Sequence, residues 1–167
     1  ISLIDLSADF IDLDLPDSAL VYLPLAEEIV VGRHDRANAY LQQNYGGAYH
    51  KIGKDKEAIV HYTKGLKLAD KLGDNSLKIL IANFISESYW ALGEDLNAYK
   101  YASFSDSISS LSPDNLGRAQ VLLGLAEAAY RVKRYEQSYK AFKGFINLRD
   151  SLLGAEKRKE IAALEQS

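Results

Sequence analysis

Apolar residues recur at intervals of three and four along most of the chain, which is the spacing of an amphipathic α-helix. One such stripe runs through Ala58, Tyr62, Leu66 and Ala69. No segment shows the strict alternation of apolar and polar residues that marks a β-strand. The pattern therefore predicts an all-α protein with helices near residues 2–12, 17–31, 36–52, 56–72, 76–92, 95–110, 113–132 and 135–165.

Turn and capping residues separate the predicted helices. Gly73 followed by Asp74 indicates a helix end and then an N-cap for the next helix. Ser112 before Pro113 indicates another helix start, with proline at the first helical position. Pro24 lies inside the second predicted helix, where it removes one internal hydrogen bond and is expected to cause a kink.

The chain repeats itself with a regular period, roughly 40 residues long, which lies in the range of helical repeat proteins. Small residues recur at positions 46, 86 and 126 and again at 58, 98 and 138, and large apolar or aromatic residues lie beside each set. A small side chain at these places lets two paired helices approach closely, so we expect residue 46 to face residue 58. The period therefore predicts four antiparallel helix pairs stacked in series.

The repeat resembles the tetratricopeptide repeat (TPR). The best-matching unit carries the TPR pattern in Tyr45, Gly46, Tyr49, Gly53, Ala58 and Tyr62. The last unit departs from the pattern, with Lys133 in place of glycine and Ser138 in place of alanine. A TPR unit is usually about 34 residues long, so the longer period implies helix pairs with about one extra turn. The resemblance implies a right-handed α-α superhelix, a fold that serves mainly to bind other proteins.

The end of the chain carries a second resemblance. The segment from Leu148 to Glu165 is similar to the end of TPR arrays in bacterial two-component sensor histidine kinases and membrane-bound regulators. This likeness implies a periplasmic input domain of an inner-membrane protein, whose last helix begins a coiled coil and joins a homodimer. Leu148, Leu152 and Leu153 are predicted to pack on the last repeat. We expect an array over residues 1–153, with units at about 1–35, 36–74, 75–114 and 115–153, and a helical extension over 154–167.

The composition excludes several classes of protein. Lys plus Arg number 20 and Asp plus Glu 23, a net charge of -3, so the chain offers no basic surface for nucleic acid. The absence of Cys excludes disulfides and thiolate chemistry, and the absence of Met suggests a processed product or an excised fragment. No apolar run approaches the roughly 18 residues that a membrane span needs, so we expect no direct membrane insertion.

No catalytic or metal-binding motif is present in the sequence. The three histidines, His34, His50 and His61, do not have the spacing of a metal-binding pair. Ser88 lies near Glu87, but the sequence places no histidine beside it to act as a base. We therefore predict a non-catalytic fragment without metal or cofactor, although the full-length parent can still be a histidine kinase.

The candidate binding site is the concave groove that the first helix of each pair lines in a TPR array. Its mixture of aromatic and charged residues suits an extended peptide or a partner protein. Gln43 and Gly47 stand where a chaperone-type carboxylate clamp has Lys and Asn, which argues against that ligand. The predicted groove residues are Tyr40, Gln43, Asn44, His50, Lys51, Asn83, Phe84, Glu87, Trp90, Glu127, Tyr130 and Arg131.

Two functions remain open on the sequence alone. The chain is either the sensory input module of a bacterial signal-transduction protein of the histidine kinase type, or a free-standing adaptor or assembly factor. In both cases the expected partner is a protein or peptide and not a nucleic acid. The first function implies the periplasm and the second the cytoplasm, and the residues that follow Ser167 would distinguish them.

Overall fold

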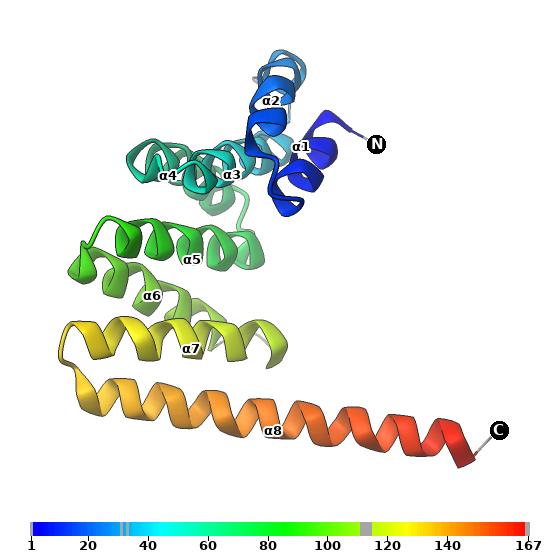
Figure 1. The fold of residues 1–167 in the computed structure, drawn as a ribbon, viewed down its shortest axis with the longest axis vertical. Coiled ribbons are helices and arrows are strands. Elements are labelled where there is room, and N and C mark those ends of the chain that lie inside the picture. The colour runs from blue at the N-terminus through cyan, green and yellow to red at the C-terminus, as the bar shows by residue number, and fades with distance from the viewer. Residues whose placement is uncertain (1, 31, 33, 111–114, 166–167) are drawn as a thin grey trace.

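The computed structural model describes residues 2–30, 32, 34–110 and 115–165, and these residues form eight helices without a β-strand (Figure 1). The predicted all-α class is confirmed, and the predicted helix ends agree within one residue wherever they are described. The predicted helix start at 112–113 lies outside the described residues. The helices are α1 (Leu3–Asp12), α2 (Pro16–Val30), α3 (Asp35–Lys51), α4 (Asp55–Lys71), α5 (Asn75–Ala91), α6 (Asp95–Ser109), α7 (Asn115–Arg131) and α8 (Tyr135–Glu165).

Consecutive helices pack in pairs, and the pairs stack in chain order. α1 packs on α2, α3 on α4, α5 on α6 and α7 on α8, while α2–α3, α4–α5 and α6–α7 contacts join one pair to the next. The described helices α3, α5 and α7 begin at 35, 75 and 115, and α4, α6 and α8 begin at 55, 95 and 135. The period predicted from the sequence is therefore confirmed in the helix positions.

The predicted pairing of small residues is also present within the helix pairs. Ser86 Oγ in α5 donates a hydrogen bond of 2.8 Å to the carbonyl oxygen of Ala98 in α6. In the next pair the roles are exchanged, and Ser138 Oγ donates at 2.8 Å to the carbonyl oxygen of Ala126. In the α3–α4 pair, Gly46 lies directly against the ring of Tyr62, one turn after the expected neighbour Ala58. Small residues at these places thus allow the close approach of each pair.

The buried apolar side chains of the described residues form three clusters along the array. The first lies among α1, α2 and α3 around Leu23 and Leu41. The second joins α3, α4 and α5 around Tyr62 and Ile81, and the third joins α6, α7 and α8 around Leu125. Because each cluster lies between neighbouring helices, the stability of the array is close to a sum of local terms.

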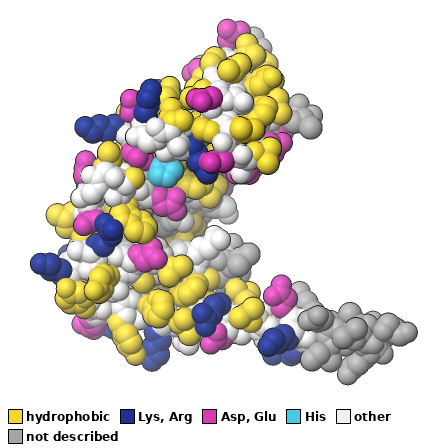
Figure 2. Space-filling view, in the orientation of Figure 1, with side chains coloured by type: hydrophobic (Ala, Val, Ile, Leu, Met, Phe, Trp, Pro, Cys, Tyr) yellow, Lys and Arg dark blue, Asp and Glu magenta, His cyan; other side chains and the backbone are white. Residues whose placement is uncertain are grey.

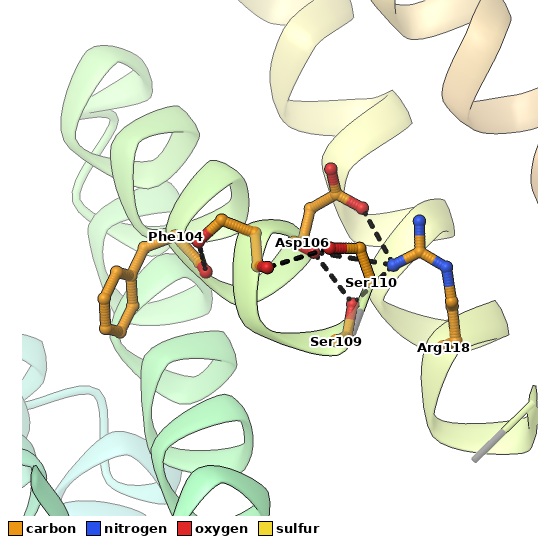
Figure 3. Close-up of polar contacts among 6 residues, drawn as sticks. Phe104, Asp106, Ser109, Ser110 and Arg118 are labelled. Atoms are coloured by element: carbon orange, nitrogen blue, oxygen red, sulfur yellow. Dashed lines mark hydrogen bonds and ion pairs between the residues drawn. The ribbon is translucent and has the colours of Figure 1, made fainter. Parts of the chain in front are cut away.

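Arg118 fastens α7 to the C-terminal turn of α6 (Figure 3). Its Nη1 lies 3.2 Å from Asp106 Oδ1 and donates a hydrogen bond of 2.8 Å to Ser109 Oγ. A cation at this place also opposes the negative end of the α6 dipole. The contact holds the two helices together on either side of residues 111–114.

α8 is longer than the helix on which it packs. It has 31 residues against 17 in α7, which at 1.5 Å per residue makes it about 20 Å longer. Figure 1 shows its C-terminal end extending past α7. Leu148 packs on the third cluster as predicted, but the prediction for Leu153 is wrong, because its side chain is 49% exposed. Leu153 points about 100° away from Leu152 on the helix, and Leu152 is half-buried.

The turns that close α1, α3, α4, α5 and α7 share one geometry. Gly53, Gly73 and Gly93 have φ of 73°, 65° and 74°, and Asp14 and Lys133 occupy the same place after α1 and α7 with φ of 60° and 62°. The next backbone N–H bonds five residues back in each case, as in Lys54 to the Tyr49 carbonyl at 2.9 Å. This is the Schellman ending of a helix, which favours glycine because a Cβ in the left-handed region costs roughly 1–2 kcal/mol.

Replacing Lys133 by glycine is expected to raise the free energy of unfolding by about 0.5–1 kcal/mol, since relief of strain exceeds the entropy cost of glycine. Urea denaturation measures the change. The matched control is Gly93→Ala, which introduces the same strain at an equivalent turn with open space around it and should lower stability by about 1 kcal/mol. An unchanged midpoint for Lys133→Gly would mean that the lysine conformation carries no strain.

Candidate functional site

A hollow of about 320 Å³ lies between α5 and α7, with α6 as its floor. Small side chains, Ala98 and Ala102, cover the floor and leave the space open. Phe84 and Trp90 of α5 form one wall, and Gly124 of α7 contributes no side chain to the other. The remaining lining residues are Leu80, Asn83, Ser86, Glu87, Gln120, Glu127, Ala128 and Arg131.

A second hollow, of about 400 Å³, lies between α1 and α3 and reaches α5. It shares Phe84 and Glu87 with the first hollow, so the two form one continuous concave surface, which we call the groove. Tyr62 of α4 reaches the groove from below. The other lining residues of this hollow are Ala8, Ile11, Asp12, Gln43, Asn44, Gly47, His50 and Lys51.

Arg131 closes one end of the groove. Its Cζ lies 4.7 Å from the centre of the Trp90 ring, a cation–π contact. The same guanidinium donates from Nη1 to Asp95 Oδ1 at 2.9 Å. Trp90 therefore has a fixed neighbour on one side and still keeps 41% of its surface exposed. An exposed, held indole is the type of group that most often anchors a protein partner.

The structure places most of the predicted groove residues on this surface. Gln43, Asn44, His50, Lys51, Asn83, Phe84, Glu87, Trp90, Glu127 and Arg131 line the two hollows. Tyr40 lines a neighbouring depression beside α1. Tyr130 lines none of these hollows; its side chain is 64% exposed, and its ring lies edge-on to Tyr135. The contributions of α1 and of the α6 floor were not among the predicted residues.

Asn44 has a structural task as well as a place at the groove. The residue is buried, and its Nδ2 donates hydrogen bonds to the Ile4 carbonyl oxygen at 2.8 Å and to Ser7 Oγ at 3.0 Å. These bonds attach α1 to α3. The amide group of Asn44 therefore stabilises the fold. Because it already donates two hydrogen bonds, it is less available to a binding partner than its predicted place in the groove indicates.

In the groove, the Lys and Arg side chains have ion-pair partners, whereas several carboxylates do not. Lys51 Nζ lies 3.0 Å from Asp14 Oδ1, and Arg131 is held by Asp95, so both basic groups have acidic partners. Asp12, Glu87 and Glu127 form no ion pair within the described part of the chain. The Glu87 side chain is exposed, but it lies between the walls of the groove, which replace part of its hydration shell. This partial burial raises the pKa of Glu87, Glu127 adds to the effect and His50 opposes it.

A serine, a histidine and an aspartate meet at the edge of the groove, which the sequence did not predict. His50 Nδ1 lies 2.5 Å from Asp55 Oδ1 and 3.5 Å from Ser88 Oγ. In a catalytic triad the serine and the aspartate bind opposite ring nitrogens, whereas here both face the same one. Ser88 is also completely buried, so no substrate reaches its hydroxyl. The cluster is therefore a packing contact that joins α3, α4 and α5.

His61 lies away from the groove in an aromatic cluster. Its ring stacks on Tyr45 and Tyr49, with centroids 4.7 Å and 5.3 Å away, and Nδ1 is 2.9 Å from Gln42 Oε1. Burial lowers the pKa of His61 below its ordinary value of 6.5, and Lys64 adds to the effect. The folded protein thus prefers the neutral imidazole.

Stability is expected to fall as the pH decreases below about 6.5, because the unfolded chain then binds a proton at His61 that the folded chain does not. His61→Phe keeps the stacking and removes the proton site, so its unfolding free energy should vary less over the same interval. Denaturation of both proteins at several pH values measures the difference. His34 and His50 are present in both proteins and contribute equally to both curves. Parallel curves of unfolding free energy against pH would contradict the prediction.

Among the described residues, no group of three or more His, Cys, Asp or Glu side chains is arranged to hold a metal ion. Within the same part of the chain, no helix combines the length and the apolar character that crossing a bilayer requires.

The fold is similar to solved TPR structures. The TPR domain of Arabidopsis FLU aligns over 70% of this chain and 98% of its own, with 17% identity and a TM-score of 0.64. The nearly identical TPR-like repeats of a protein from Podosopora anserina, described as a putative kinesin light chain, align over 89% of this chain and 74% of theirs, with 14% identity and a TM-score of 0.73. A second structure of such repeats covers 90% and 94%, with 12% identity and a TM-score of 0.57.

No protein-family model and no curated protein matches the sequence. The likeness therefore concerns the fold, which three structures of low sequence identity share over most of their length. The helix pairs, their regular period and this likeness agree, and the chain has an all-α, TPR-like repeat fold.

Proposed function

We propose that the chain is a non-catalytic interaction domain that binds an extended peptide or protein segment in its groove. The observation that carries this proposal is the continuous concave surface, on which Phe84 and Glu87 connect two hollows and Trp90 remains accessible. Its size is in the range of ligand sites, and its lining combines aromatic rings with a few polar groups. The TPR-like fold supports the proposal, because TPR arrays generally serve as platforms for proteins.

Selection of short random peptides displayed on phage, with the folded chain as bait, tests this function. Selected peptides should bind Trp90→Ala at least about tenfold more weakly, since exposed aromatic anchors carry much of such binding energy. Tyr130→Ala is the matched control, because it removes an exposed aromatic residue outside the groove and should leave the affinity unchanged. Peptides that are insensitive to Trp90→Ala would show that the groove is not the site.

We further propose that this domain is the sensory input module of a bacterial signalling protein of the histidine kinase type, on the periplasmic side of the inner membrane. The support is the resemblance of the segment from Leu148 to Glu165 to the end of such input arrays. The full coding sequence tests it: a membrane span and a signalling domain after Ser167 are expected. Their absence would favour the alternative, a free-standing adaptor or assembly factor.

The outer face of α8 supports the proposed homodimer. Tyr135, Tyr139 and Phe142 follow one another at steps of four and three, which is the spacing of a helix–helix seam, and all three are exposed. Figure 2 shows hydrophobic side chains gathered over the end of the molecule that α7 and α8 form. Light scattering should report a dimer for the chain and a monomer for Phe142→Glu. A monomeric parent at high concentration would contradict the pairing.

A further inference from the structure

The groove is an apolar surface with an excess of unpaired negative charge. Its lysine and its arginine already have acidic partners, Lys51 in Asp14 and Arg131 in Asp95, and His50 is paired with Asp55. Glu87 and Glu127 line the hollow between α5 and α7 without a basic partner among the described residues. An acidic ligand would find no free cation here, whereas a cationic ligand would find two free carboxylates.

We propose that the groove selects a basic peptide segment, with a Lys or Arg side chain of the partner inserted between α5 and α7 at Glu87 and Glu127. This inference rests on the peptide-binding function proposed above and names the class of peptide. The long aliphatic stem of either residue packs on Phe84 and over the Ala98 floor, while its charged head reaches the carboxylates. The hollow thus matches both parts of an amphipathic side chain.

The adjoining hollow extends the same preference along the peptide. Asp12 there has no ion-pair partner in the described ranges, and Glu87 belongs to both hollows. Both hollows therefore present carboxylates without an ion-pair partner among the described residues, which a basic segment complements.

The repulsion between Glu87 and Glu127 also favours a cationic ligand. Partial burial raises the pKa of Glu87, His50 opposes the shift and the nearby Glu127 adds to it, so the two carboxylates repel each other. A bound ammonium or guanidinium group offsets that repulsion. Such charge complementarity contributes to both the rate and the specificity of association.

The peptides selected on phage against the folded chain provide the test, because a random library favours neither basic nor acidic sequences. Those that depend on Trp90 should be enriched in Lys and Arg and depleted in Asp and Glu. A synthetic peptide from that set should bind Glu87→Gln and Glu127→Gln about tenfold more weakly each, and its affinity for the parent should fall with added salt. Glu28→Gln, which removes an exposed carboxylate on α2 away from the groove, is the matched control and should bind like the parent.

The outcomes separate the two proposals. If Trp90-dependent peptides are acidic or uncharged, or if both glutamine variants bind a basic peptide as the parent does, the basic preference is wrong and the groove function stands. If no selected peptide depends on Trp90, the groove function fails and the preference with it. Thermal melting of each variant establishes that a lost affinity does not reflect a lost fold.

Discussion

Replacing Tyr62 by alanine is expected to lower the free energy of unfolding by about 3–5 kcal/mol. Tyr62 is the largest fully buried side chain of the described residues, with 1% of its surface exposed. Its ring lies against Gly46 in α3 and stacks on Phe84 in α5, with centroids 5.5 Å apart. Removing the ring leaves a cavity at the junction of three helices, where the tightly matched backbones cannot collapse to fill it.

Urea denaturation measures this loss, and Tyr62→Phe is the matched control. The phenylalanine keeps the ring and its stacking, and the missing hydroxyl lies beside the second hollow, so its effect should stay below about 1 kcal/mol. Since whole domains are stable by only about 5–15 kcal/mol, the alanine variant should be close to unfolding in mild denaturant. Equal stability of the two variants would show that the ring does not hold the pairs together.

The fold could be predicted because the information is repeated in the chain. Small residues return at equivalent positions in the three units from residue 36 onward, and turn glycines return in two of them, so these units independently support the same helix ends. At Lys133 the sequence loses the glycine but the backbone keeps its left-handed turn, because the neighbouring helices α7 and α8 fix the geometry. One strained residue is tolerated where the remaining contacts determine the structure.

The groove could be predicted only in part, and Tyr130 shows why. Shifting α5 positions by one repeat carries Trp90 onto Tyr130, which assumes that both helices present the same flank to the groove. A hollow between two successive helices is instead lined by the flanks that face each other. Positions 120, 124 and 127 of α7 are the repeat equivalents of 80, 84 and 87 of α5 and line the hollow as those do. Beyond them the flanks differ: α5 adds 83, 86 and 90, whereas α7 adds 128 and 131, and Tyr130 points about 100° away from Arg131.

The contact between His50 and Ser88 had no signal in the sequence. The two residues are 38 positions apart and lie on different helices, and the repeat pattern equates positions without saying which side chains touch between pairs. The same limit applies to the α6 floor of the groove. Ala98 and Ala102 satisfy the packing pattern, and only the spacing of α5 from α7 shows that they also face open space.

Replacing Gly46 by alanine is expected to destabilise the protein by about 1–3 kcal/mol, against the usual trend for a helix interior. Alanine normally stabilises such a position by roughly 0.5–1 kcal/mol relative to glycine. At Gly46, however, the added Cβ would overlap Cδ1 and Cε1 of the Tyr62 ring. The ring is buried on all sides and cannot move aside, so the two helices must separate.

Gly124→Ala is the matched control, since it makes the same change in the interior of α7 where nothing lies within 4 Å of the new Cβ. It should raise stability by about 0.5–1 kcal/mol, so the two variants should shift the urea midpoint in opposite directions. A second measurement isolates the cause. In a Tyr62→Ala background, Gly46→Ala should no longer destabilise, because the atoms that it meets are gone. A penalty that persists there would mean that Gly46 is required by its backbone and not by the close packing of α3 on α4.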